Sequence, residues 1–160
     1  MKSSIRLVIS DMVGAMRTFV YRACFELGEK RGVIVVSFPD VPEAITEGRG
    51  ETDASNQAQE ALGLALLTYP GRNLPLPKPK ARGSNLVPIA VEPAVAAKLA
   101  FLDAFREAGI GKSEFGRRIG KDEKEVRRLL DPKHPTKLST LTDALRILGQ
   151  RLIISVEAAA

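Results

Sequence analysis

The chain of 160 residues is 44% hydrophobic and 27% charged, and it carries a formal net charge of +5. This length and apolar content allow one medium domain or two small ones, and they exclude a disordered chain. Aromatic residues make up 5% of the chain and tryptophan is absent, which argues against a stacking platform for single-stranded nucleic acid.

The N-terminal segment is expected to contain neither a signal peptide nor a membrane span, because Arg6 and Asp11 interrupt its apolar residues. Met16 offers an internal start, so we expect residues 1–15 to be an extension outside the fold. The single Cys24 excludes an internal disulfide and fits a reducing, cytoplasmic setting. Its place in an apolar strand pattern favours packing over catalysis.

The next part of the chain has a β-β-β-α pattern. Residues 17–27 and 33–38 are rich in β-branched and aromatic residues and are separated by a Gly-Glu-Lys-Arg-Gly turn, which predicts a hairpin. A short third strand is expected at 44–48. Thr52 is predicted to cap an Ala-rich helix that ends near residues 69–71. This order predicts a small sheet with one helix packed across it.

A proline-rich segment follows and is predicted to be a linker between two domains. Pro75, Pro77 and Pro79 alternate with other residues, which excludes helix and favours polyproline II. Residues 86–91 are apolar enough to add a further strand, and the sequence does not decide which domain that strand joins.

Two short amphipathic helices are predicted between Lys112 and Pro132, after a longer helix from Pro93 to Gly109. Ser113 is the expected N-cap of the first short helix. Gly120 can adopt the left-handed conformation that ends it. Asp122 and Glu125 then form a capping-box pattern at the start of the second. This spacing is typical of a helix-turn-helix motif.

The second short helix is predicted to be the recognition helix of this motif. Its apolar residues Val126, Leu129 and Leu130 recur at helical spacing, which directs the intervening charged residues outward, where the major groove of DNA would meet them. Residues 112–137 contain nine Lys/Arg and five Asp/Glu, a net charge of +4. A basic motif of this kind indicates binding to duplex DNA. A helix at 139–148 and a strand from Arg151 are expected to follow.

The N-terminal half has the opposite charge. Residues 16–70 contain five basic and eight acidic side chains, a net charge of −3. Such a split predicts different partners for the two halves: a polyanion for the C-terminal half and a cationic surface for the N-terminal half.

The residues do not form an obvious catalytic centre. His134 is the only histidine and lies in a Pro-flanked loop, while the only thiol belongs to the other half of the chain, so a His/Cys metal site is not expected. Asp40, Glu43 and Glu47 could hold magnesium as a nuclease would, or form an acidic rim for a basic partner. We expect no enzymatic activity, metal or cofactor.

Two motifs connect the chain to a known family. Phe-Pro-Asp-Val-Pro at 38–42 is followed by Gly-Glu-Thr at 50–52, and a Leu-Pro-Leu-Pro linker comes after the Ala-rich helix. With the helix-turn-helix pattern, residues 17–157 resemble HicB-family antitoxins that carry a C-terminal DNA-binding domain. The segment before Met16 departs from that pattern.

The resemblance implies a partial ribonuclease H-like N-terminal domain without nuclease activity. This domain would bind and block a small basic RNA-cleaving toxin, HicA. The helix-turn-helix would bind operator DNA as a homodimer or higher oligomer and repress the shared operon. The acidic N-terminal half fits this implication, because a surface that cleaves RNA must attract phosphates and an acidic face can compete for it.

These inferences predict an α+β chain with an extension at 1–15, a toxin-binding domain at 16–70, a linker at 71–91, and a helix-turn-helix domain with a terminal strand at 92–160. The tentative toxin contacts are Glu26, Asp40, Glu43 and Glu47. The predicted DNA contacts are Lys124, Arg127 and Arg128 at base edges or adjacent phosphates, and Lys112, Arg117, Lys121, Lys133 and Lys137 chiefly at phosphates. The alternative function is a ligand-responsive transcription regulator, which requires a sizeable apolar pocket in its N-terminal sensor domain.

Overall fold

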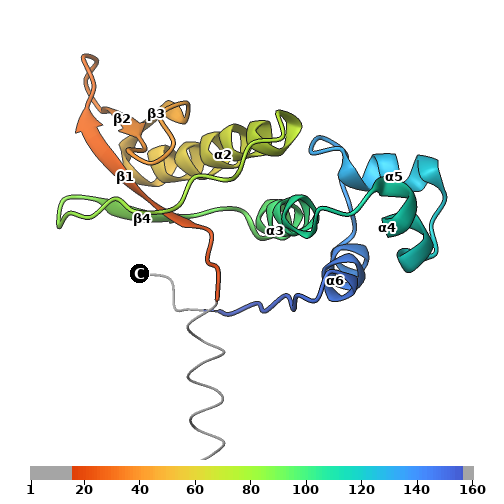
Figure 1. Cartoon of the computed structure of the whole chain (residues 1–160). Coiled ribbons are helices and arrows are strands. Elements are labelled where there is room, and N and C mark those ends of the chain that lie inside the picture. Colours follow the sequence, from red (N-terminus) through yellow and green to blue (C-terminus); the bar gives the residue numbers. More distant parts are fainter. Residues whose placement is uncertain (1–15, 157–160) are drawn as a thin grey trace, which may run out of the picture.

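The computed structural model describes residues 16–156 and has an α+β fold (Figure 1). The predicted fold class is confirmed, and the predicted extension at 1–15 lies outside the described residues. The elements in chain order are β1 (Val20–Leu27), β2 (Val33–Ser37), β3 (Ile45–Arg49), α2 (Gly50–Gly71), β4 (Val87–Ala90), α3 (Pro93–Ala108), α4 (Lys112–Ile119), α5 (Glu123–Leu130) and α6 (Leu138–Ile147).

The four strands form one antiparallel sheet in the order β3-β2-β1-β4. β4 pairs with β1, with Tyr21 opposite Ile89, so the strand expected at 86–91 joins the N-terminal sheet. The Tyr21 hydroxyl donates to the Pro77 carbonyl at 2.7 Å. The proline-rich segment is therefore attached to the sheet at two points, by this bond and by β4.

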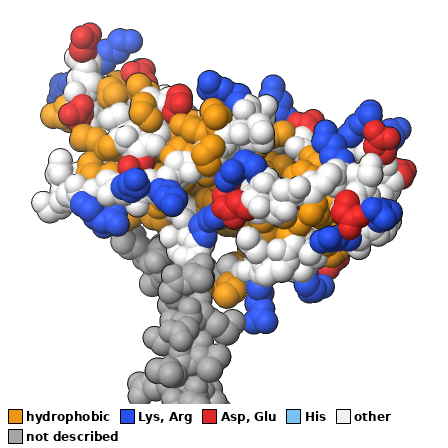
Figure 2. All heavy atoms as spheres, in the orientation of Figure 1, with side chains coloured by type: hydrophobic (Ala, Val, Ile, Leu, Met, Phe, Trp, Pro, Cys, Tyr) orange, Lys and Arg blue, Asp and Glu red, His pale blue; other side chains and the backbone are white. Residues whose placement is uncertain are grey.

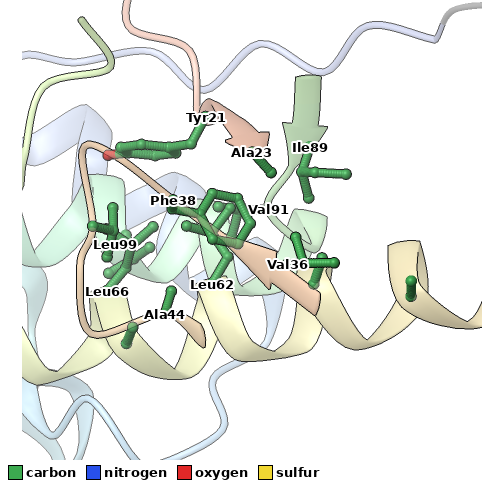
Figure 3. Close-up of a cluster of buried hydrophobic side chains, with 14 residues drawn as sticks. Tyr21, Ala23, Val36, Phe38, Ala44, Leu62, Leu66, Ile89, Val91 and Leu99 are labelled. Atoms are coloured by element: carbon green, nitrogen blue, oxygen red, sulfur yellow. The ribbon is translucent and has the colours of Figure 1, made fainter. Parts of the chain in front are cut away.

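The first hydrophobic core lies between the sheet and α2 (Figure 3). Val36 and Phe38 from the sheet side pack toward Leu62 and Leu66 of α2, and all four are buried. Gly48 in β3 is required by this packing, because a Cβ atom there would lie 2.4 Å from the backbone nitrogen of Ala54. The close approach lets α2 begin directly after β3.

The second core joins α3 to α4, α5 and α6. The rings of Phe105 and Phe115 meet edge to face with centroids 5.3 Å apart, and Phe101 and Phe115 lie 5.7 Å apart. α3 contributes to both cores, since Leu99 packs in the first and Phe101 in the second. This helix is therefore the structural link between the sheet and the C-terminal helices.

Two predicted helix N-caps are wrong. α2 begins at Gly50, so Thr52 lies in its first turn, and the Asp53 carboxylate instead accepts from the Arg49 N–H at 2.7 Å. α4 begins at Lys112 with Gly111 at the N-cap position, which places Ser113 inside the helix. In both cases the backbone turns into the helix before it reaches the residue with the hydroxyl side chain.

The predicted terminal strand is also wrong for the residues that the structure describes. Residues 151–156 have no regular secondary structure, and Leu152 alone among them packs against the second core. Their β-branched composition favours a strand, but a strand forms only beside a partner strand. No neighbouring strand in residues 16–156 pairs with this segment.

Candidate nucleic-acid interface and acidic faces

The turn between α4 and α5 is fixed by three local features. Gly120 has a φ of 68°, in the left-handed region expected for it. Asp122 and Glu125 form the predicted capping box: the Glu125 N–H donates to Asp122 at 2.8 Å, and the Asp122 N–H donates to Glu125 at 3.2 Å. At Gly116, a Cβ atom would lie 3.0 Å from the Lys121 carbonyl oxygen. These features set the direction in which α5 leaves the turn.

α5 has one buried and one exposed face. Val126 and Leu129 are buried in the second core, whereas Lys124, Arg127 and Arg128 are exposed. This division is the one that the apolar spacing predicted. Figure 2 shows Lys and Arg side chains gathered over the region of α4 and α5, with carboxylates among them. The exposed face of α5 can approach a polyanion without disturbing the core.

Three of the predicted DNA contacts already form ion pairs within their own segment. Arg127 contacts Glu123 at 2.6 Å and Lys121 contacts Glu125 at 3.0 Å, while Arg117 pairs with Glu114. The Lys121 ammonium, as hydrogen-bond donor, lowers the pKa of Glu125. The remaining predicted contacts have no ion-pair partner within residues 16–156; they are Lys112, Lys124, Arg128, Lys133 and Lys137.

Sequence reasoning missed Lys98, a buried lysine of α3. Its Nζ donates to the Leu129 carbonyl at the C-terminal end of α5, at 2.6 Å, and to the Thr136 hydroxyl at 2.9 Å. Burial lowers the pKa of Lys98 from 10.5 to about 8. The helical spacing indicates this burial, because Lys98 lies four residues before the buried Leu102, on the apolar face of the helix. This contact anchors the end of α5 to α3.

The sheet brings two predicted toxin contacts together on its outer face. Strand register places Glu26 of β1 and Glu47 of β3 on either side of Val35 of β2, in one row across three strands. The next row on the same face contains Cys24, Ser37 and Ile45, of which Ile45 is 64% exposed. None of these six residues is buried. The outer face is thus an open, partly apolar surface with two carboxylates.

Asp40 and Glu43 lie away from this row, in the loop between β2 and β3. Asp40 accepts from the N–H groups of Lys80 and Ala81, at 2.9 and 2.8 Å. Glu43 accepts from the Tyr69 hydroxyl at 2.9 Å. The pKa of Tyr69 is raised by its partial burial and by this bond. Asp40 therefore organises the proline-rich segment, and the four predicted carboxylates divide into two separate pairs.

The magnesium hypothesis receives no support from this arrangement. Within residues 16–156, no three His, Cys, Asp or Glu side chains lie close enough together to hold a metal ion. Asp40, Glu43 and Glu47 were the residues proposed for that role. The bonds of Asp40 and Glu43 and the strand position of Glu47 direct them to different surroundings.

A shallow hollow lies between α2 and α3. It has a volume of about 400 Å³, opens to the surface and is edged by Glu60 and Glu92 beside Leu64 and Val95. This is not the enclosed apolar pocket that a metabolite sensor requires. In the part of the chain that the structure describes, no helix has the length and apolar character needed to span a membrane.

Comparison with known proteins shows relatives along most of the chain. It is 37% identical over 121 residues to "Antitoxin HicB" of Escherichia coli (strain K12), covering 76% of this chain and 88% of that protein. It is 34% identical over 128 residues to "Antitoxin HicB 1" of Photorhabdus laumondii subsp. laumondii, with 80% and 81% covered. "Antitoxin HicB" of Pseudomonas fluorescens is 30% identical over 141 residues, with 88% and 97% covered. No family model matches the chain.

Proposed function

The chain belongs to the HicB antitoxin family, and from this premise we propose that it binds and occludes a small RNA-cleaving toxin and represses its own operon. It is an antitoxin of a toxin–antitoxin system, so a toxin is its partner. The finer proposal is that the toxin is a basic, HicA-like ribonuclease bound by the N-terminal half, and that α4 and α5 form a helix-turn-helix bound to operator DNA. The single observation that carries the proposal is the similarity to named antitoxins over 73–88% of the chain.

The DNA-binding part is supported by the geometry of α4 and α5. The Asp122–Glu125 capping box closes the turn, one face of α5 is buried, and the opposite face presents Lys124, Arg127 and Arg128. A helix held in this way can enter the major groove while cations on α4 and in the following loop contact phosphates. Glu123 is either an acceptor for a cytosine amino group or only the ion-pair partner of Arg127.

The outer face of the sheet is the surface we propose for the toxin. It is open, it exposes Ile45 beside half-buried Val35 and Cys24, and it carries Glu26 and Glu47. A toxin that grips RNA must present cations, and these meet carboxylates at the rim of an apolar contact. Glu43 is available at a second, separate position, whereas Asp40 is engaged by two backbone N–H groups.

The first test is to co-express this chain with the product of the neighbouring open reading frame. We expect a small basic protein that co-purifies with this chain. It should cleave RNA when alone and should not cleave RNA in the complex. A neighbour that does not bind, or that cleaves RNA equally well when bound, contradicts the antitoxin mechanism. The DNA-binding proposal would then stand on its own measurements.

The DNA contact is tested by charge reversal on α5. We expect Arg127→Glu to weaken operator binding about tenfold or more while toxin binding is unchanged, and to lower the salt slope of log K by about one. Arg146→Glu is the matched control, because Arg146 lies on α6, is similarly exposed and also pairs with a carboxylate of its own helix. Equal losses in both variants would show a general charge effect and contradict the placement of α5 in the groove.

The toxin contact is tested by neutralising the sheet-face carboxylates. We expect the double variant Glu26→Gln/Glu47→Gln to slow association with the toxin several-fold at low salt, with a smaller effect at high salt. The control Glu51→Gln/Glu60→Gln removes the same charge from exposed positions on α2, off this face. If the control slows association and the sheet-face variant does not, the toxin binds elsewhere on the N-terminal half.

A further inference from the structure

The proline-rich segment between α2 and β4 carries cations that no carboxylate neutralises. Residues 71–91 contain four basic side chains and no acidic one, whereas residues 16–70 have a net charge of −3. Within residues 16–156, none of the four forms an ion pair; they are Arg72, Lys78, Lys80 and Arg82. Figure 2 shows Lys and Arg side chains on the side of the sheet along which this segment runs, apart from those over α4 and α5.

Three of these cations lie on one side of the segment. Lys78, Lys80 and Arg82 are exposed, whereas Pro79 and Ala81 between them are half-buried. This alternation is that of an extended chain, in which every second side chain points to the same side and successive cations are about 6–7 Å apart. The Arg82 Nη1 donates to the Ala81 and Pro79 carbonyls, at 2.9 and 3.4 Å, which leaves other guanidinium N–H groups free. We call these three residues the cationic row.

The backbone of the cationic row is held in place from the sheet side. The Asp40 carboxylate accepts from the N–H groups of Lys80 and Ala81, at 2.9 and 2.8 Å. The Tyr21 hydroxyl donates to the Pro77 carbonyl at 2.7 Å, just before the row begins. Because the backbone is already ordered, a ligand of the row pays only for ordering the side chains.

A straight row of cations fits the phosphates of a nucleic acid. Residues 71–91 contain no Phe, Tyr or Trp, so the segment offers no ring on which the bases of a single strand could stack. The phosphates of duplex DNA need no such ring, since Lys and Arg bind them by charge and hydrogen bonds regardless of sequence. Duplex DNA is therefore the polyanion that the cationic row suits best.

We propose that Lys78, Lys80 and Arg82, ordered by Asp40, bind phosphates of duplex DNA beside the segment that α4 and α5 contact. This second site lies on the N-terminal sheet, and it rests on the proposed binding of operator DNA by those two helices. The cationic row adds affinity without adding sequence preference. It also lengthens the stretch of duplex that one chain binds.

DNA binding by the full-length chain, followed by fluorescence anisotropy, tests the second site with two duplexes. The short duplex is the smallest fragment upstream of this reading frame whose binding Arg127→Glu weakens, and the long duplex adds about 10 base pairs, one helical turn, at each end. We expect Lys78→Gln/Lys80→Gln/Arg82→Gln to bind the long duplex about tenfold more weakly and to lower its salt slope by about 2–3. The same variant should bind the short duplex like the original chain.

The control Lys30→Gln/Arg31→Gln/Arg49→Gln removes three charges from exposed positions at the β1–β2 turn and the end of β3. Equal weakening by both triple variants shows a general charge effect and overturns the second site. If the row variant binds both duplexes like the original chain, the second site is wrong and the proposed role of α5 stands. A chain that binds neither duplex overturns both. Loss of affinity for single-stranded RNA of the same length, with DNA binding unchanged, also overturns the proposal.

Two substitutions of Asp40 test whether the order of the row matters. Removing this carboxylate strengthens DNA binding if only charge counts. Asp40→Asn removes the charge but keeps an oxygen that can accept from the Lys80 and Ala81 N–H groups, whereas Asp40→Ala removes both. We expect Asp40→Ala to bind the long duplex several-fold more weakly than Asp40→Asn, and the two to bind the short duplex equally. Equal affinities for the long duplex overturn the role of Asp40 in ordering the row.

Discussion

The sheet with α2 and the unit formed by α4, α5 and α6 differ in the sequence distance of the contacts that hold them. In the sheet unit, Tyr21 pairs with Ile89, and Glu26 lies in one row with Glu47. In the helical unit, the capping box and the ion pairs of α4 and α5 join residues three or four apart, and Phe115 of α4 packs against Phe101 and Phe105 of α3. Different substitutions should therefore destabilise the two units. Because α3 packs in both cores, any coupling between the stabilities of the two units must act through this helix.

The largest expected effect is selective loss of the helical unit. Phe115→Ala removes a fully buried ring from the aromatic cluster, and we expect a loss of about 3–5 kcal/mol in the free energy of unfolding of that unit. Both tyrosines, Tyr21 and Tyr69, belong to the sheet unit and the chain has no tryptophan. Urea unfolding followed by tyrosine fluorescence and by far-ultraviolet circular dichroism should then separate into two transitions. Phe38→Ala is the matched control in the first core. Coincident transitions in both variants would show that the units unfold as one.

A smaller effect is expected from a single methyl group in the sheet unit. Gly48→Ala places a Cβ atom against the backbone of Ala54, and overpacking of this kind costs about 1–3 kcal/mol. Gly63→Ala is the control, because its Cβ atom would meet only the Val95 side chain at 3.5 Å. Alanine also favours helix over glycine by about 1 kcal/mol, so the control should stabilise α2. Denaturation midpoints compare the two, and equal shifts would contradict the close contact between β3 and α2.

The smallest expected effect on the free energy of unfolding at neutral pH comes from Lys98, where α3 contacts the end of α5. Its pKa is about 8 in the folded chain and 10.5 as the ordinary value, so the folded state binds fewer protons between these values. Stability should therefore rise as pH increases from about 8 toward 10.5, and this gain is lost as pH falls through 8. Lys98→Met should flatten this part of the stability curve, measured by urea unfolding between about pH 7 and 9.5. Higher pH is avoided because burial raises the pKa of Tyr21 to about 12, which adds an opposite dependence above the ordinary tyrosine value of 10.0. An identical slope in both proteins would contradict a buried, titrating Lys98.

The same difference in contact distance explains what could be predicted from the sequence. Gly109 and Gly120 as helix ends and the Asp122–Glu125 box were predicted correctly, because each depends on residues within one turn. The exposed face of α5 followed from apolar spacing for the same reason. The assignment of β4 to the sheet, the row of Glu26 and Glu47, and the role of Asp40 in binding the Lys80 and Ala81 backbone depend on contacts between distant residues. No local pattern specifies such contacts.

The incorrect predictions have equally specific causes. Thr52 and Ser113 have side chains suited to an N-cap. The helices begin before them, however, at Gly50 and Lys112. The strand from Arg151 was predicted from β-branched composition alone, which says nothing about whether a partner strand is within reach. The burial of Lys98 runs against the general preference of lysine for the surface, although its spacing from Leu102 is that of a buried position and its ammonium is satisfied by the Leu129 carbonyl.

The ion pairs of α4 and α5 have a consequence for the specificity of the proposed DNA binding. Glu114, Glu123 and Glu125 serve as built-in counterions for Arg117, Arg127 and Lys121, respectively. When a phosphate replaces one of these carboxylates, an internal anion is displaced from the cation, while cation release from the DNA proceeds as usual. Each such exchange adds repulsion between the freed carboxylate and the nucleic acid. A polyanion that places no phosphate at Arg117, Arg127 or Lys121 gains little binding free energy from these three cations. The ion pairs therefore favour a correctly docked duplex over non-specific binding.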